Sequence, residues 1–195
     1  MNKNLLLRPR LELAKLPTPL DRVENLGKSL GNLDLWIKRD DLTGFGFGGN
    51  KVRSLEYLAA DAMKKNSNIL ITGGSHGSNH VRTTMAVAAH LGLKGFAILS
   101  GTRPSTKNGN LLLDQLLGAK LIFTGDENRS NIDNFIEDEV KRLQSLDERP
   151  YLIRRGGVSS LGCIGYVSAA MEICSQLQNL NLKPDILLCA TGCGV

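Results

Sequence analysis

Apolar and polar positions alternate along the chain in a pattern that predicts strands followed by helices. Short apolar runs bounded by glycine or polar residues are typical of buried strands, whereas apolar residues that recur every three or four positions are typical of helices. This alternation predicts a three-layer α/β fold, with a mostly parallel sheet and helices on both faces. Strands are expected at residues 33–41, 69–72, 95–99, 119–123, 151–153 and 185–190, and helices at 51–62, 108–118, 131–146, 162–177 and after Ser78.

A glycine-rich turn places one lysine, Lys51, at the start of the helix expected at residues 51–62. Glycines within residues 44–49 permit backbone conformations that other residues resist, so the turn can approach a ligand closely. Free N–H groups and the helix dipole favour anions at a helix start. A lysine amine can bond to an aldehyde when burial or a nearby cation activates it, and Arg53 and Lys38 are close in sequence. We therefore expect Lys51 to take part in chemistry beside a phosphorylated cofactor, and not to be an exposed surface residue.

Two nucleotide-binding motifs are incomplete around this lysine. Gly44, Gly46 and Gly49 match the spacing G-x-G-x-x-G, but the next strand, at residues 69–72, runs into glycines. A dinucleotide-binding turn needs an acidic residue at about that place. A Walker A loop needs serine or threonine after its lysine, and Val52 stands there. Neither motif is predicted.

A second polar turn, SHGSN, precedes the next helix. Ser78 can cap that helix, and Ser78, Asn79 and the first free N–H groups form a collar suited to a carboxylate or a cofactor oxygen. Plain helix capping is the alternative. His76 and His80 stand four residues apart, but the glutamate of H-E-x-x-H is missing and no third ligand is evident. We expect no metal site.

The last segment of the chain is an apolar run that ends in Thr191, Gly192, Cys193 and Gly194. A turn of small residues can present consecutive N–H groups to an anion. A strand with a frayed end is the alternative, and the residues alone leave both interpretations open.

Composition narrows the class of protein without selecting it. The chain has 195 residues, 42% of them hydrophobic, which is enough for a real core. Its formal charge is +5, but lysine and arginine are scattered and aromatic residues make up only 5%, so nucleic acid is not expected as a partner. Four cysteines show no C-x-x-C pair, and no segment approaches the ~20 apolar residues of a membrane span. We expect reduced thiols, no membrane partner and a cytoplasmic location.

The order of motifs from Leu11 to Gly194 resembles one enzyme family. RLELAKLPTPL, LWIKRDD, GGNKVRSLEYLAADA, ILITGG, SNHVR, NGNLLLD, GGVSSLGCIGYV and ATGCG follow one another as in the pyridoxal-phosphate enzymes that include D-cysteine desulfhydrase and 1-aminocyclopropane-1-carboxylate deaminase. PTPL and GGNK are shared with the wider tryptophan synthase β-like group, whereas GGNK followed by RSLEYLAADA and SNHVR points to this branch. The resemblance implies the tryptophan synthase β-like fold, also called fold type II, and pyridoxal 5′-phosphate as cofactor.

The resemblance also implies roles for single residues. Lys51 would hold the cofactor through a Schiff base and would act as a general base once released. Asn50 and Asn79 would contact the cofactor, Asn79 at the ring oxygen. Ser78, Asn79 and His80 would bind the substrate, with Ser78 at the reacting end. His80 matches the desulfhydrase form of the motif more closely than the deaminase form.

Two further points come from the same resemblance. Thr191, Gly192, Cys193 and Gly194 would begin the loop that holds the cofactor phosphate. Gly77 departs from the family pattern, which usually has glutamine there, and loss of that amide can alter the fit of the substrate.

The resemblance implies a larger domain that is incomplete in this chain, because family members continue past its last residue. Residues 51–165 would form the smaller domain, and residues 1–50 and 166–195 would form part of the larger one. An unfinished sheet exposes an unpaired edge and an apolar face. We therefore expect poor solubility or dependence on a partner, either the second copy of a homodimer or a complementing C-terminal fragment.

The function implied by the resemblance is breakdown of a small amino acid to a 2-oxoacid and ammonia. The main prediction is a lyase like D-cysteine desulfhydrase, which forms pyruvate, sulfide and ammonia. The alternative is a 1-aminocyclopropane-1-carboxylate deaminase, which forms 2-oxobutanoate and ammonia with Ser78 in the active site. A third hypothesis, of another class, is an inactive or split-gene fragment without independent catalysis.

Overall fold

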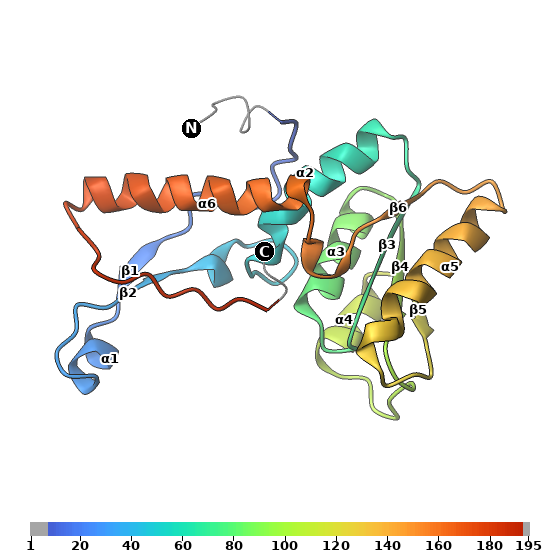
Figure 1. Cartoon of the computed structure of the whole chain (residues 1–195), viewed down its shortest axis with the longest axis horizontal. Coiled ribbons are helices and arrows are strands. Elements are labelled where there is room, and N and C mark those ends of the chain that lie inside the picture. Colours follow the sequence, from blue (N-terminus) through green and yellow to red (C-terminus); the bar gives the residue numbers. More distant parts are fainter. Residues whose placement is uncertain (1–7, 193–195) are drawn as a thin grey trace.

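The computed structural model describes residues 8–192, which form a four-stranded parallel sheet, a separate two-stranded sheet and the helices around them (Figure 1). The large sheet has the order β5-β4-β3-β6, and every neighbouring pair is parallel. The predicted α/β class with a parallel sheet is thereby confirmed. The strands of this sheet are β3 (Ile69–Gly74), β4 (Lys94–Leu99), β5 (Lys120–Phe123) and β6 (Pro150–Leu152).

The helices lie on both faces of the sheet and beyond one end of it. Four of the predicted helices are confirmed with bounds that differ by a few residues, and the helix after Ser78 is confirmed as α3. The short helix α1 and three 3-10 helices were not predicted, because their residues show no clear apolar period in the sequence. The helices are α1 (Glu24–Ser29), η2 (Asp40–Leu42), α2 (Lys51–Lys64), α3 (Asn79–His90), α4 (Gly109–Leu116), η3 (Arg129–Asn131), α5 (Ile132–Gln144), η4 (Arg155–Gly157) and α6 (Ser160–Asn179).

Side chains of the strands alternate between two apolar layers. Ile69 and Ile71 of β3 pack with α5 on one face, whereas Leu70 between them packs with α2 and α3 on the other. Ala97 of β4 packs with α3 and α4 on that second face. Full burial of an aliphatic side chain is worth about 1.5–3 kcal/mol, so the two layers hold the sheet and its helices together.

Helix α2 connects the sheet to the rest of the chain, because it packs both on α3 and on the long helix α6 (Figure 1). The contact with α6 is close at Gly165, where a Cβ atom would lie 2.2 Å from the carbonyl oxygen of Arg53. Only glycine allows the two backbones to approach so closely. Neither α6 nor any other helix within residues 8–192 is long and apolar enough to cross a membrane.

The N-terminal part forms a small antiparallel sheet outside the parallel one. β1 (Leu20–Arg22) pairs with β2 (Trp36–Lys38), and α1 lies between them in sequence. The strand predicted at residues 33–41 is confirmed but much shorter. β1 was not predicted, because three residues carry no readable alternation. The predicted domain boundaries, between residues 50 and 51 and between residues 165 and 166, stay predictions.

The prediction of a strand at residues 185–190 is wrong. This segment is an irregular coil, with Ile186 and Leu187 each 77% exposed and Leu188 85% exposed. An apolar run forms a strand only where another strand supplies backbone donors and acceptors. The described residues place no strand beside it, so its apolar side chains stay in contact with solvent.

Candidate functional site

The starts of α2 and α3 lie at the carboxyl end of the parallel sheet. α3 follows β3 through a short turn, and a Cβ atom on Gly74 would lie 3.0 Å from the Ser78 Oγ atom. α2 runs back toward the start of β3 (Figure 1), which leaves Lys51 on the same side as the end of β3. Ligand sites in open α/β sheets form outside the carboxyl ends of the strands. The tertiary structure therefore brings the two predicted site segments to one edge.

Backbone geometry explains the glycines before Lys51. Gly48 and Gly49 have φ values of +77° and +104°, which L side chains rarely adopt. A Cβ atom on Gly48 would also lie 2.1 Å from the carbonyl oxygen of Asp41. Lys51 itself is half-buried at the first position of α2. Among residues 8–192, no carboxylate pairs with its amine, which leaves the Lys51 Nζ atom available for chemistry.

The second segment caps α3 and presents an amide beside it. Ser78 is the N-cap residue, and its Oγ atom accepts a hydrogen bond of 3.3 Å from the backbone N–H of Val81. Asn79 is exposed, and its Oδ1 atom accepts a 2.9 Å hydrogen bond from Asn110 on α4. The predicted cap is confirmed. The predicted contacts of Ser78 and Asn79 with a cofactor and a substrate stay predictions.

His80 lies under this segment and not on its surface. Its ring is 4% exposed, and its Nε2 atom is 3.1 Å from the Thr72 hydroxyl oxygen on β3. Burial, and then the positive charge of Lys51, lower the pKa of His80 to about 4, so the ring is neutral at neutral pH. This effect also shows that Lys51 is near. The role of His80 in substrate binding stays a prediction, while His76 is exposed in the preceding turn.

Tyr166 on α6 is a site residue that sequence analysis did not single out. Its hydroxyl oxygen accepts a 2.9 Å hydrogen bond from the Asn50 side-chain amide, next to Lys51. Burial raises the pKa of Tyr166 to about 12, with Asp40 adding to the effect. The motif GCIGYV contained this tyrosine, but its distance from Asn50 in sequence concealed the contact. The contact fixes the Asn50 amide against α6.

The two cations close to Lys51 in sequence, Arg53 and Lys38, pair with carboxylates in a largely buried charge cluster. Arg53 is 1% exposed, and its guanidinium donates two hydrogen bonds of 2.7 Å to Asp40. It also donates bonds of 3.1 and 3.2 Å to Glu172 of α6. Lys38 of β2 pairs with the same Glu172 carboxylate. Asp40 and Glu172 therefore neutralise both cations, and the cluster joins α2, α6 and β2.

Acid is expected to weaken this cluster through Glu172. Burial alone would raise the pKa of Glu172, but hydrogen bonds from Arg53 and Lys38 outweigh it and lower the pKa from 4.5 to about 2. A depressed pKa in the folded state means that the stabilisation is present above about pH 4.5 and is lost as the pH falls toward 2. We expect a loss of about 3 kcal/mol across this window, measured by urea denaturation at successive pH values.

The matched variants for this prediction are Glu172→Gln and Glu24→Gln. Glu172→Gln should remove the acid-dependent part of the free energy of unfolding. Glu24→Gln changes a carboxylate that is 62% exposed, so this variant should keep the acid-dependent part. Equal acid sensitivity of Glu172→Gln and the parent chain would contradict the prediction.

The predicted phosphate-binding turn is only partly described. Thr191 and Gly192 lie in exposed coil, and no hydrogen bond joins them to Lys51 in the part of the chain that the structure describes. Cys193 and Gly194 lie outside the described residues. Cys189 lies close enough to Tyr166 to contribute to the raised pKa of that tyrosine. The segment therefore passes near the Asn50 contact, and its role in phosphate binding stays a prediction.

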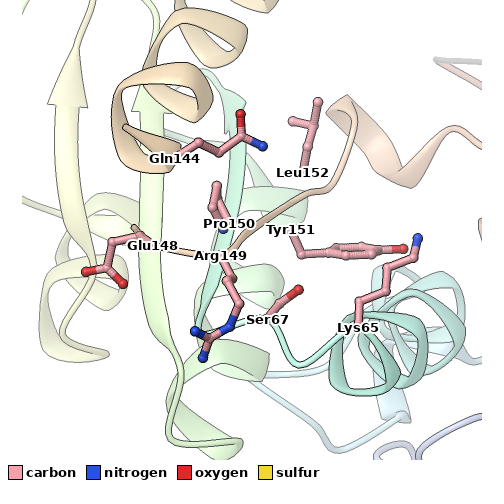
Figure 2. Close-up of a pocket in the computed structure, with 8 residues that line it drawn as sticks. All are labelled: Lys65, Ser67, Gln144, Glu148, Arg149, Pro150, Tyr151 and Leu152. Carbon is pink, nitrogen blue, oxygen red and sulfur yellow. The ribbon is translucent and has the colours of Figure 1, made fainter. Parts of the chain in front are cut away.

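A pocket of about 490 Å³ lies elsewhere, at the amino ends of the strands (Figure 2). Lys65 and Tyr151 lie side by side in it, with the lysine Nζ atom 5.2 Å from the ring centre. Lys65 follows the C-terminal end of α2, and a helix of 14 residues is about 21 Å long. The pocket is thus on the opposite edge of the sheet from Lys51 and takes no part in the candidate site. Its lining residues are Lys65, Ser67, Gln144, Glu148, Arg149, Pro150, Tyr151 and Leu152.

The donor set at the carboxyl edge fits a cofactor with an aldehyde and anionic oxygens. It combines the amine of Lys51, which has no carboxylate partner within residues 8–192, with the amide of Asn79, the hydroxyl of Ser78 and the free N–H groups of two helix starts. The glycine turn leaves the approach to Lys51 free of side chains at residues 48 and 49. A lysine placed in this way at the carboxyl ends of parallel strands is the arrangement expected of a pyridoxal-phosphate enzyme.

Comparison with known proteins agrees with this class. The profile of the family described as pyridoxal-phosphate dependent enzyme matches residues 11–195, so the chain belongs to that family. A D-cysteine desulfhydrase of Klebsiella pneumoniae (strain 342) is 41% identical over 181 residues, which cover 90% of this chain and 54% of the relative. A Pyrococcus furiosus protein, provisionally named 1-aminocyclopropane-1-carboxylate deaminase, is 37% identical over 186 residues, which cover 95% of this chain and 56% of that protein.

A solved structure supports the same assignment of fold. The crystal structure of an ACC deaminase homologue has a TM-score of 0.83 and 38% identity, and the match covers 89% of this chain and 53% of that one. The family and the fold predicted from the motifs are thereby confirmed. The chain spans about half the length of the relatives it matches.

Proposed function

We propose that this chain provides the lysine-bearing part of a pyridoxal-phosphate enzyme that breaks down a small amino acid to a 2-oxoacid and ammonia. The observation that carries the proposal is the half-buried Lys51 amine, unpaired among the described residues, at a helix start on the carboxyl edge of the sheet. Similarity to the D-cysteine desulfhydrase of Klebsiella pneumoniae supports D-cysteine as substrate, with pyruvate, sulfide and ammonia as products.

The residues on this edge have separate tasks in the proposed reaction. When bound, pyridoxal phosphate supplies an aldehyde and a ring that accepts electrons. Lys51 would hold the cofactor covalently through Nζ, and its amine, once free, would take a proton from the substrate Cα atom. Asn50 and Asn79 would orient the cofactor, because Tyr166 and Asn110 hold their amides in place.

The substrate would bind at the start of α3. Free N–H groups at a helix N-terminus attract a carboxylate, and the Ser78 hydroxyl lies at this position as the N-cap. A Cβ atom on Gly77 would meet nothing within 4 Å, so the turn has room for the glutamine that the family pattern usually has there. His80, neutral and buried, would support this segment from below.

A second candidate function is ring opening of 1-aminocyclopropane-1-carboxylate. Similarity to the structure of an ACC deaminase homologue favours it, at a TM-score of 0.83. The two functions differ in product, because D-cysteine gives sulfide and pyruvate, whereas the cyclopropane substrate gives 2-oxobutanoate without sulfide. Separate assays of sulfide and of each 2-oxoacid distinguish them.

Partners and location belong to the same proposal. The exposed residues Ile186, Leu187 and Leu188 support association with a second copy or with a complementing C-terminal fragment, since exposed apolar runs favour burial. Sedimentation of the purified chain, alone and with such a fragment, measures this association. The free thiols of Cys163 and Cys174 support a cytoplasmic location.

Covalent labelling tests the proposal directly. The purified chain is incubated with pyridoxal phosphate, reduced with borohydride and mapped by mass spectrometry. We expect one dominant adduct at Lys51, lost in Lys51→Ala and retained in Lys65→Ala, which removes a 61% exposed lysine just after the other end of α2. Equal labelling of many surface lysines in the parent chain would contradict the proposed site.

A further inference from the structure

We propose that Arg82 of α3 is a positioning residue for the turn that carries Lys51, and that Asn110 of α4 is the positioning residue for Asn79. The inference rests on the proposed function for what Lys51 does. The position of the glycine turn before Lys51 follows from contacts within this chain and does not depend on the proposed function.

Arg82 supports the glycine turn from α3. Its side chain is 5% exposed, and its Nη2 atom donates a hydrogen bond of 3.2 Å to the carbonyl oxygen of Gly48. A Cβ atom on Gly49 would lie 3.9 Å from the same nitrogen. The turn also packs on α3 at Gly46, where a Cβ atom would lie 2.8 Å from the Ala86 Cβ atom. Arg82 thus holds the backbone three residues before the reactive amine.

Asp114 of α4 is a second buried charged group close to α3, which packs on α4. Its carboxylate is fully buried, and neither oxygen has a hydrogen-bond partner among residues 8–192. The Nε and Nη1 atoms of Arg82 also lack partners within that range. Burial raises the pKa of Asp114 to about 7 and the positive charge of Arg82 opposes the shift, but no ion pair joins the two groups among the described residues. A buried charge is costly without a counter-charge, so a variant that removes Arg82 should also remove the Asp114 carboxylate.

Asn110 carries the second contact, one helical turn before Asp114. Residues four apart lie on the same face of a helix, so both side chains belong to one side of α4. The Asn110 amide donates a hydrogen bond of 2.8 Å to the carbonyl oxygen of Gly77 and one of 2.9 Å to Asn79 Oδ1. α4 packs on α3 and contacts the second segment directly through Asn110, whereas the lysine turn is held from α3 by Arg82.

Hydrogen exchange of the chain without cofactor tests the inference at pH 8, where the Asp114 carboxylate is ionised. The variant Arg82→Met/Asp114→Leu replaces both buried charged groups by apolar ones, so that neither charge stays buried alone. We expect the amides of Gly48 and Gly49 to exchange about tenfold faster, as for loss of one hydrogen bond, with β3 and β4 unchanged. The control, Arg142→Met/Glu139→Leu, removes a pair on α5 and should leave the turn unchanged.

Two results would overturn the inference: unchanged exchange in the turn, or an equal increase in the turn, β3 and β4, which would mean a structural role only. If the double variant does not fold, Arg82→Gln/Asp114→Asn is measured in its place and must give the same local increase. Labelling gives an independent readout, because selectivity of the pyridoxal-phosphate adduct for Lys51 should fall about tenfold in the variant. A parent chain without a selective adduct rejects the proposed function, whereas the exchange result alone decides the positioning.

Discussion

Replacing Arg53 with methionine is expected to lower the free energy of unfolding by about 3–5 kcal/mol, because it removes a cation from a buried charge cluster and leaves the carboxylates in place. Methionine retains much of the apolar stem of Arg53 but leaves the carboxylates of Asp40 and Glu172, which are 21% and 12% exposed, without their shared cation. Asp40 then loses its cation and Glu172 keeps only Lys38, at a place where solvent screens charges poorly. Urea denaturation at pH 7 measures the loss.

The matched control for this prediction is Arg142→Met. Arg142 donates two hydrogen bonds of 2.7 Å to Glu139, so its bond lengths match those between Arg53 and Asp40. It is 48% exposed, however, and surface ion pairs contribute about 0–1 kcal/mol. A loss for Arg53→Met no larger than that of the control would show that the cluster does not join α2 to α6.

Alanine at position 165 is expected to lower the free energy of unfolding by about 3 kcal/mol, since it forces α6 away from α2. The new Cβ atom would lie 2.2 Å from the carbonyl oxygen of Arg53 and 2.8 Å from the backbone nitrogen of Ser54. These are backbone atoms and cannot rotate aside. Alanine gains ~1 kcal/mol over glycine in a helix, but this gain is smaller than the cost of separating two helices.

Thermal and urea denaturation of Gly165→Ala, compared with Gly77→Ala, measure this effect. A Cβ atom on Gly77 would meet nothing within 4 Å, so the control should be close to neutral. The close contact also lies beside Asn50 and Lys51 at the start of α2, and we expect labelling of Lys51 to become less selective in Gly165→Ala. Wild-type stability in this variant would contradict the close packing of the two helices.

Much of the parallel sheet was predictable from the sequence because its signals are local. Four apolar runs became β3, β4, β5 and β6, and the helices between them have regular apolar spacing. Ser78 was predictable as a cap for the same reason, since a cap acts on the residues that follow it. Lys51 could be singled out because the glycines before it and the helix after it are its immediate neighbours in sequence.

Interpretations that needed a distant partner were the ones that failed or were missed. The run at residues 185–190 has the composition of a buried strand, but no neighbouring strand pairs with it in the described part of the chain. Arg53 and Lys38 are near Lys51 in sequence, yet both form ion pairs with Glu172 of α6. Tyr166 contacts Asn50 across 116 positions. No local pattern could identify these contacts.

The sequence by itself therefore determined the order of strands and helices, the parallel α/β class, the family and the place of Lys51 at a helix start. Tertiary structure alone decided which charges neutralise one another, that Arg82 reaches the Gly48 carbonyl and that Asn110 reaches Asn79. The physical reason is one of range. Apolar periodicity and capping act within one or two helical turns, whereas a buried charge or amide is stabilised by whichever group the folded chain brings within hydrogen-bond distance.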